Sequence, residues 1–147
     1  MKRLLSFCLL VFSLTVSSSA REWPPIIEED MSETIRTFYR AYVANLGNDA
    51  KIDSLLSQYC TPALKSAVQE AIEQDDYDFV LNGYGGSVID ETLLFVAKVG
   101  NKYRVTFKVP KYPVSSGLAT VTVNVLYDFR QDKITAIIRP SDNYQVP

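Results

Sequence analysis

The periodicity of apolar residues changes once along this chain, and that change limits the folds available to it. Between residues 30 and 73, apolar side chains recur every three or four positions, as in helices with one buried face. From Val88 onward they recur at every second position, as in strands with one buried and one solvated face. Helices followed by an antiparallel meander form the α+β class. We therefore predict N-terminal helices packed on one face of a curved antiparallel sheet of about four strands.

Three helices are expected in the first half. The first has a capping-box-like start at Asp30 and Glu33 and ends at Gly47. Its apolar face consists of Ile35, Phe38, Tyr39, Tyr42, Val43 and Leu46. The second helix is shorter and carries Ile52, Leu55, Leu56 and Tyr59 on one side. The third starts at Thr61-Pro62, an N-cap followed by proline at the first helical position, and runs to about Glu73 with Leu64, Val68, Ala71 and Ile72 on its apolar face.

The second half predicts four strands. Gly100-Asn101 is a two-residue hairpin signal between the first two, and Pro140 stops the last. Arg104 and Lys108, together with Lys111 in the connection that follows, form a modest basic patch on the wet face, which we expect to be a solvated strand face. The strands expected are Thr92–Val99, Lys102–Val109, Ala119–Tyr127 and Ile134–Ile138.

The N-terminus is typical of an export signal. Lys2 and Arg3 precede an apolar run that is shorter than the ~20 residues of a membrane span, and Ser18-Ser19-Ala20 supplies the small residues of a cleavage site. We predict a signal peptide over 1–20, an extended lead-in over 21–29 and one α+β domain over 30–147. A retained N-terminal anchor is the alternative. The protein is expected in the periplasm or the medium, with no membrane span after cleavage.

Composition excludes several functions. The chain has no histidine, so serine–histidine and cysteine–histidine nucleophiles are excluded and the commonest transition-metal ligand is missing. After loss of Lys2 and Arg3, 13 of the 15 basic residues remain against 17 acidic ones, and no basic stripe survives, so we expect no nucleic-acid partner. Cys60 is the single cysteine after Cys8 leaves with the signal, and we expect a small buried hydrophobe. No cofactor is expected.

The order and spacing of several weak motifs carry a family resemblance. The motifs are Phe38-Tyr39 with Tyr42, the run from Tyr59 to Leu64, Asp76-Tyr77-Asp78-Phe79 and the alternating valine strands. Over residues 31–139 the chain resembles the nuclear transport factor 2-like, cystatin-like superfamily, and within it a family of secreted bacterial proteins known only as a domain of unknown function. That family ends with a tryptophan-bearing strand and a basic residue, whereas this chain has no tryptophan between Ile134 and Arg139.

The resemblance implies a cone-shaped fold with a cavity between helices and sheet. Members of the superfamily include isomerases, dehydratases, protein-binding adaptors and immunity proteins, so the fold does not select a function.

Aromatic and polar residues around the glycine-rich loop form the candidate binding site. Tyrosine beside glycine is typical of recognition surfaces for glycans, peptides and proteins. We therefore predict an exported, non-catalytic binding protein, a monomer or a homodimer, whose ligand is a small molecule, a glycan or a protein. The binding residues expected are Tyr77, Asp78, Asn82, Tyr84 and Tyr112.

The acidic run Asp75, Asp76 and Asp78 leaves alternatives open. It lacks the spacing of a calcium loop, so we expect a solvated turn and no metal. As an exposed protrusion it would suit an immunity protein or inhibitor that blocks a basic active site.

An isomerase- or dehydratase-like enzyme is a further alternative. It would pair Asp78 with Tyr42 or Tyr39, or Asp90 with Tyr103. It predicts one of these carboxylates buried in a cavity within hydrogen-bond reach of a tyrosine, whereas pure binding predicts no pH-poised carboxylate there.

Overall fold

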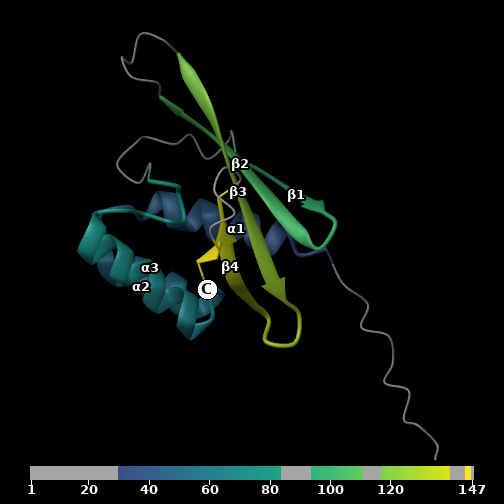
Figure 1. Ribbon diagram of the computed structural model, residues 1–147, viewed down its shortest axis with the longest axis horizontal. Helices are drawn as coiled ribbons and strands as arrows, with labels where there is room; N and C mark the ends of the chain where they lie inside the picture. Colours follow the sequence, from purple (N-terminus) through teal and green to yellow (C-terminus); the bar gives the residue numbers. More distant parts are fainter. Residues whose placement is uncertain (1–29, 84–93, 111–116, 140–144, 147) are drawn as a thin grey trace, which may run out of the picture.

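Three helices lie on one face of an antiparallel sheet in the computed structural model, as the change of periodicity predicts (Figure 1). The model describes residues 30–83, 94–110, 117–139 and 145–146. The expected signal peptide (1–20) and lead-in (21–29) lie outside the described residues. The α+β class is confirmed.

The described elements follow in the order helices, then strands. The helices are α1 (Ser32–Ala44), α2 (Asp49–Tyr59) and α3 (Pro62–Asp75). The strands are β1 (Phe95–Val99), β2 (Lys102–Pro110), β3 (Leu118–Asp128), β4 (Lys133–Ile138) and β5 (Gln145–Val146). They pair antiparallel in the order β1-β2-β3-β4-β5, so the two-residue β5 adds an edge that the sequence did not indicate. Within the described ranges, no helix has the length and hydropathy required to cross a bilayer.

The helix starts are set by local hydrogen bonds, and one of them differs from the prediction. Thr61 Oγ1 accepts a hydrogen bond from the Leu64 N–H at 3.4 Å, which confirms the cap of α3. The predicted capping box at the start of α1 is wrong, because the Glu33 carboxylate pairs with Arg36 instead of accepting a hydrogen bond from the backbone N–H at the start of the helix. The Asp30 carboxylate instead accepts the Ser32 N–H at 2.9 Å.

The end of α1 also differs from the prediction. The helix stops at Ala44, and Gly47 lies in the following turn with φ +81°. The C-cap is Asn45, so the predicted capping role of Gly47 is wrong and this glycine lies in the turn beyond the cap.

The sheet has one buried and one exposed face, as the alternation in β2 predicts. Tyr103, Val105 and Phe107 point into the core, while Arg104 points out. Alternation breaks at a bulge between Leu126 and Tyr127 of β3. Opposite it, β4 buries Ile134, Ala136, Ile137 and Ile138.

Aromatic side chains fill the space between helices and sheet. Phe38 of α1 lies within 5.3 Å of the Tyr39 ring, 5.7 Å of Tyr42 and 5.5 Å of Tyr59, measured between ring centroids. Tyr103 and Phe107 are fully buried from the sheet side. These buried rings pack against one another in the core between helices and sheet.

Two backbone contacts attach the helical layer to the sheet. The Thr61 N–H donates to the Ile134 carbonyl at 2.9 Å, which ties the α2–α3 connection to β4. The Met31 N–H donates to the Tyr103 hydroxyl at 3.2 Å, which ties the start of α1 to β2. The helices are thereby held at both ends of the buried face.

Two phenylalanines test this account of the core. Phe38→Ala removes a fully buried ring and is expected to lower the free energy of unfolding by about 3–5 kcal/mol, from lost burial plus the cavity left behind. Phe95→Ala, at a side chain 62% exposed, is the control and is expected to change it by less than about 0.5 kcal/mol. Urea unfolding measures both, and equal effects would contradict the assignment of the core.

Candidate functional site

A pocket of about 460 Å³ opens at one end of the helical layer. Its described walls come from the end of α1, the start of α2, the last turn of α3 and the loop that follows, and none comes from a strand. The residues that line it are Tyr42, Leu46, Gly47, Asp49, Ile52, Ile72, Asp76, Asp78 and Gly83. The pocket therefore lies beside the packed core rather than between helices and sheet.

Asp78 is the most constrained side chain in this pocket. Its Oδ1 accepts hydrogen bonds from the N–H groups of Val80 at 2.8 Å and Leu81 at 3.2 Å. Its Oδ2 accepts one from the Tyr42 hydroxyl at 3.2 Å. The Asp78 carbonyl also accepts the Gly83 N–H at 2.7 Å, so this residue fixes the loop after α3.

The environment of Asp78 changes its proton affinity. Burial raises the pKa of its carboxyl above the ordinary 3.8, although the hydrogen bonds from Leu81, Val80 and Tyr42 act in the opposite direction. Burial, with the neighbouring carboxylate, also raises the pKa of Tyr42, so that side chain donates a hydrogen bond rather than ionising. This is the buried Asp–Tyr pair that the enzyme alternative requires, and Asp90, its second option, lies outside the described residues.

Two more carboxylates line the pocket from other elements. Asp49 is the first residue of α2, and Asp76 ends α3 in a left-handed conformation with φ 49°. No lysine or arginine is among the described lining residues. The described part of the chain contains no cluster of three acidic or cysteine side chains that could hold a metal ion.

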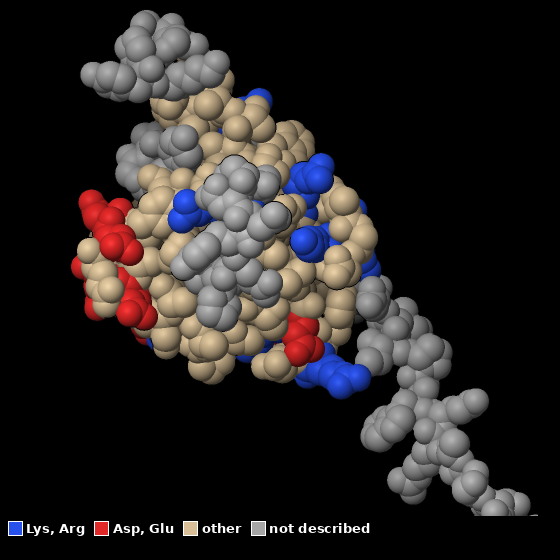
Figure 2. Space-filling view, in the orientation of Figure 1, with Lys and Arg blue, Asp and Glu red and all other residues tan. Residues whose placement is uncertain are grey.

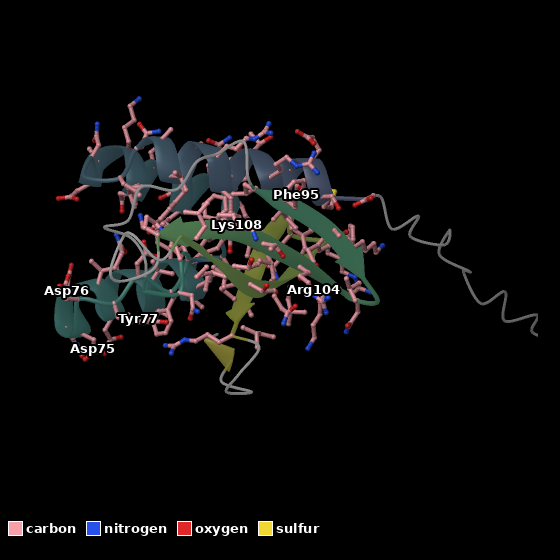
Figure 3. The ribbon with its side chains drawn as sticks, turned by 90° about the horizontal axis from the view of Figure 1, so that it is seen from above. Asp75, Asp76, Tyr77, Phe95, Arg104 and Lys108 are labelled. Atoms are coloured by element: carbon pink, nitrogen blue, oxygen red, sulfur yellow. The ribbon has the colours of Figure 1, made fainter. Side chains whose placement is uncertain are left out.

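The acidic run is divided by the structure. Asp75 and Asp76 are exposed at the end of α3 (Figure 3), whereas Asp78 turns inward. Figure 2 shows acidic side chains gathered at this end of the molecule. A protrusion made of all three residues is therefore not formed.

Tyr77 and Asn82 form a separate cluster next to the pocket. The Tyr77 hydroxyl donates to Asn82 Oδ1 at 2.8 Å, and the Arg139 guanidinium lies 4.2 Å from the centroid of the Tyr77 ring. Phe79 packs edge-on against Tyr77 at 5.1 Å. A Cβ added to Gly83 would lie 2.7 Å from the Tyr77 ring. The cluster holds the loop in place.

The five predicted binding residues therefore separate into three groups. Asp78 lines the pocket, Tyr77 and Asn82 bond to each other beside it, and Tyr84 and Tyr112 lie outside the described residues. Ligand contact by any of them stays a prediction.

Besides Asp78, the sequence indicates Tyr42 and Asp76 as candidate functional residues, but it does not identify the other residues that line the pocket. Ile72, expected on the buried face of α3, is 38% exposed, and Asp49 carried no signal beyond its place at a helix start. Such residues meet only because three helix ends converge.

Two other predicted features of the core have clear outcomes. Cys60 is buried, and burial raises its pKa to about 12, which confirms a small hydrophobe rather than a reactive thiol. The hydroxyl of Tyr39 is buried without a hydrogen-bond partner among the described residues, whereas the Tyr42 hydroxyl reaches Asp78 at the pocket.

Comparisons with known proteins give a fold relative without a known activity. No protein-family model matches the chain, and no curated protein does. The chain is similar to a protein of unknown function from Bacteroides thetaiotaomicron VPI-5482, with a TM-score of 0.61 and 26% sequence identity. The match covers 76% of this chain and 90% of that one. The similarity extends to the α+β fold and to a bacterial protein whose function is not known.

Two glycines test how the loop is held. Gly83 and Gly47 have positive φ angles of 80° and 81°, so alanine at either position costs about 1–2 kcal/mol of backbone strain. Only at Gly83 does the added methyl meet a ring, so Gly83→Ala is expected to be less stable than Gly47→Ala by about 1–3 kcal/mol. Thermal or urea unfolding measures the difference. Equal losses would show that Tyr77 does not pack against this glycine.

Proposed function

We propose that the protein is an exported binding protein that holds a small organic cation with a hydrocarbon body in the pocket at the end of the helical layer. The observation that carries this proposal is that Asp49, Asp76 and Asp78 all line one pocket, whose described wall contains no basic residue. Carboxylates from the start of α2 and from the end of α3 with its following loop favour a cation and disfavour an anion in the same space. Export rests on residues 1–20 of the sequence.

The remaining walls specify what accompanies the charge. Leu46, Ile52 and Ile72 supply aliphatic surface. The wall thus combines apolar surface with the three carboxylates and the Tyr42 hydroxyl. Small-molecule sites likewise combine apolar surface with placed polar groups. An alkyl or aryl amine would place its hydrocarbon part on this surface and its ammonium group near the carboxylates.

Asp78 supports binding because its position is fixed in advance. Its two oxygens are held by two backbone N–H groups and the Tyr42 hydroxyl, so little side-chain freedom is lost when a ligand arrives. A cation that reaches it replaces part of the solvation that burial removes. Binding of a cation would therefore lower the pKa of Asp78 toward its ordinary value.

Three probes with the same hydrocarbon body test the proposal: hexylammonium, hexanol and hexanoate. Hexylammonium is expected to shift the amide resonances of Gly47 and Gly83, whereas hexanoate is not. Asp76→Asn is expected to weaken hexylammonium about fivefold, the loss of about 1 kcal/mol from a half-exposed ion pair. Asp75→Asn removes the same charge one residue away, outside the pocket wall, and serves as the matched control.

Acidification gives an independent readout of the same site. Because the pKa of Asp78 is raised, its carboxylate is neutralised at a higher pH than that of an ordinary aspartate, and hexylammonium affinity is expected to fall with it. Hexanol affinity should not change. Tighter binding of hexanoate than of hexylammonium at neutral pH would overturn the proposal.

Acid–base catalysis is the second candidate, favoured by the contact between Asp78 and the Tyr42 hydroxyl. A carboxyl with a raised pKa can accept a proton from a carbon next to a carbonyl, while a tyrosine hydroxyl donates to the carbonyl oxygen. This would resemble the isomerases of the superfamily that the sequence suggests. We rank it below binding because the Asp78 oxygens already hold the loop and the Tyr42 hydroxyl.

Solvent deuterium exchange tests this second candidate. If Asp78 abstracts a proton, the protein incorporates deuterium into a β,γ-unsaturated ketone, and both Asp78→Asn and Tyr42→Phe abolish the incorporation. Tyr59→Phe, on the same helical layer, should leave it intact. Binding without catalysis predicts no incorporation above the protein-free rate.

A further inference from the structure

The face of the sheet that points away from the helices has a composition unlike the rest of the molecule. It is formed by the outward positions of β1, β2 and β3, which we call the outer sheet face. Sequence alternation alone indicates a solvated strand face there, but in the structure large apolar side chains are exposed on this face beside its basic residues. The residues that define it are Phe95, Val99, Lys102, Arg104, Lys108 and Leu118.

Charge is segregated between this face and the helical layer. β1 and β2 contain no aspartate or glutamate, and β3 contains one, Asp128, as its last residue. The helical segment 30–78 carries nine acidic residues against four basic ones. Figure 2 shows most of the visible basic side chains on the side away from the acidic end of the helices, with one acidic patch near the lower edge of that side.

The cations of the outer sheet face have no acidic partner within the described ranges. The side-chain ion pairs among the described residues join Arg36 to Glu33 and Lys65 to Asp53, and all four residues lie on helices. Lys108 instead donates to the Thr120 hydroxyl on the neighbouring strand. These positive charges are therefore available to a negative surface.

Exposed apolar side chains are interleaved with these cations. Phe95 is 62% exposed and lies opposite Thr106, and therefore between Arg104 and Lys108 along the neighbouring strand. Leu118 is 53% exposed and lies opposite Pro110. Thr106 and Pro110 are four residues apart on β2, which corresponds to roughly 13 Å.

The distance between the exposed apolar side chains discriminates between the possible classes of partner. A protein interface concentrates its apolar anchors in one central cluster surrounded by a polar rim, whereas here they are dispersed. A soluble polyanion would engage the cations but give the apolar side chains nothing to contact. An anionic bilayer supplies negative headgroups and apolar volume at every point of its surface, so dispersed apolar and basic side chains both contribute.

We propose that the outer sheet face binds peripherally to an anionic lipid surface, with Phe95 and Leu118 at the headgroup boundary and Arg104 and Lys108 among the headgroups. Figure 3 shows Phe95, Arg104 and Lys108 on the sheet and Asp75 and Asp76 at the far end of α3. The proposal does not depend on the ligand of the pocket.

Vesicle co-sedimentation of residues 21–147, which keep every described element, tests the proposal without the apolar N-terminal run. The protein is expected to bind vesicles of phosphatidylcholine with about one third phosphatidylglycerol and to dissociate from them at high salt. It is expected not to bind vesicles of pure phosphatidylcholine. Arg104→Gln/Lys108→Gln should weaken partition about 25-fold, at about fivefold for each cation. Arg40→Gln/Lys51→Gln removes the same charge from exposed helical positions and should not weaken it.

Phe95→Ser separates lipid from other anionic partners. It leaves the charge unchanged and alters an exposed side chain, so the fold should survive, which circular dichroism checks. It is expected to weaken vesicle binding several-fold while leaving binding to dextran sulfate unchanged. Failure to bind anionic vesicles at low salt, equal loss in the helical control, or vesicle binding indifferent to Phe95→Ser would each overturn the proposal.

Discussion

The aromatic packing between α1 and the sheet determines where this protein can hold a ligand. Phe38, Tyr39, Tyr103 and Phe107 fill the volume that a cone-shaped fold leaves between helices and sheet. A filled interior moves any small-molecule site to the boundary of the core. Tyr42 marks that boundary, because its ring is packed against Phe38 while its hydroxyl contacts Asp78 at the pocket.

Asp78 shows how one side chain connects fold and function. Its partial burial opposes ionisation, and three hydrogen bonds favour it. The pKa remains raised, so the burial penalty exceeds what those hydrogen bonds return. The same bonds fix the loop after α3 and orient the carboxylate. The hydrogen bonds that fix the loop thus explain the position of Asp78. A nearby cation would offset the free-energy cost of burying its carboxylate.

Local signals in the sequence were enough for the fold but not for the site. Thr61-Pro62 and Gly100-Asn101 marked a helix start and a hairpin correctly because capping and turn geometry depend on adjacent residues. Asp78 was named because it stands in an acidic, aromatic run, and its contact with Tyr42 was weighed as one option. The sequence does not identify Asp49 and Ile72 as pocket residues, because a pocket made by three helix ends depends on tertiary packing. The bulge at Leu126 likewise has no local signature.

The most direct test of the cation-binding account is native mass spectrometry of residues 21–147 exposed to an envelope extract of the source cell. The account predicts a retained small molecule that is released as a nitrogenous cation. Retention should be reduced in Asp76→Asn and unchanged in Asp75→Asn, because Asp76 lines the pocket and Asp75 does not. A retained carboxylate or phosphate, or retention indifferent to both substitutions, would contradict it.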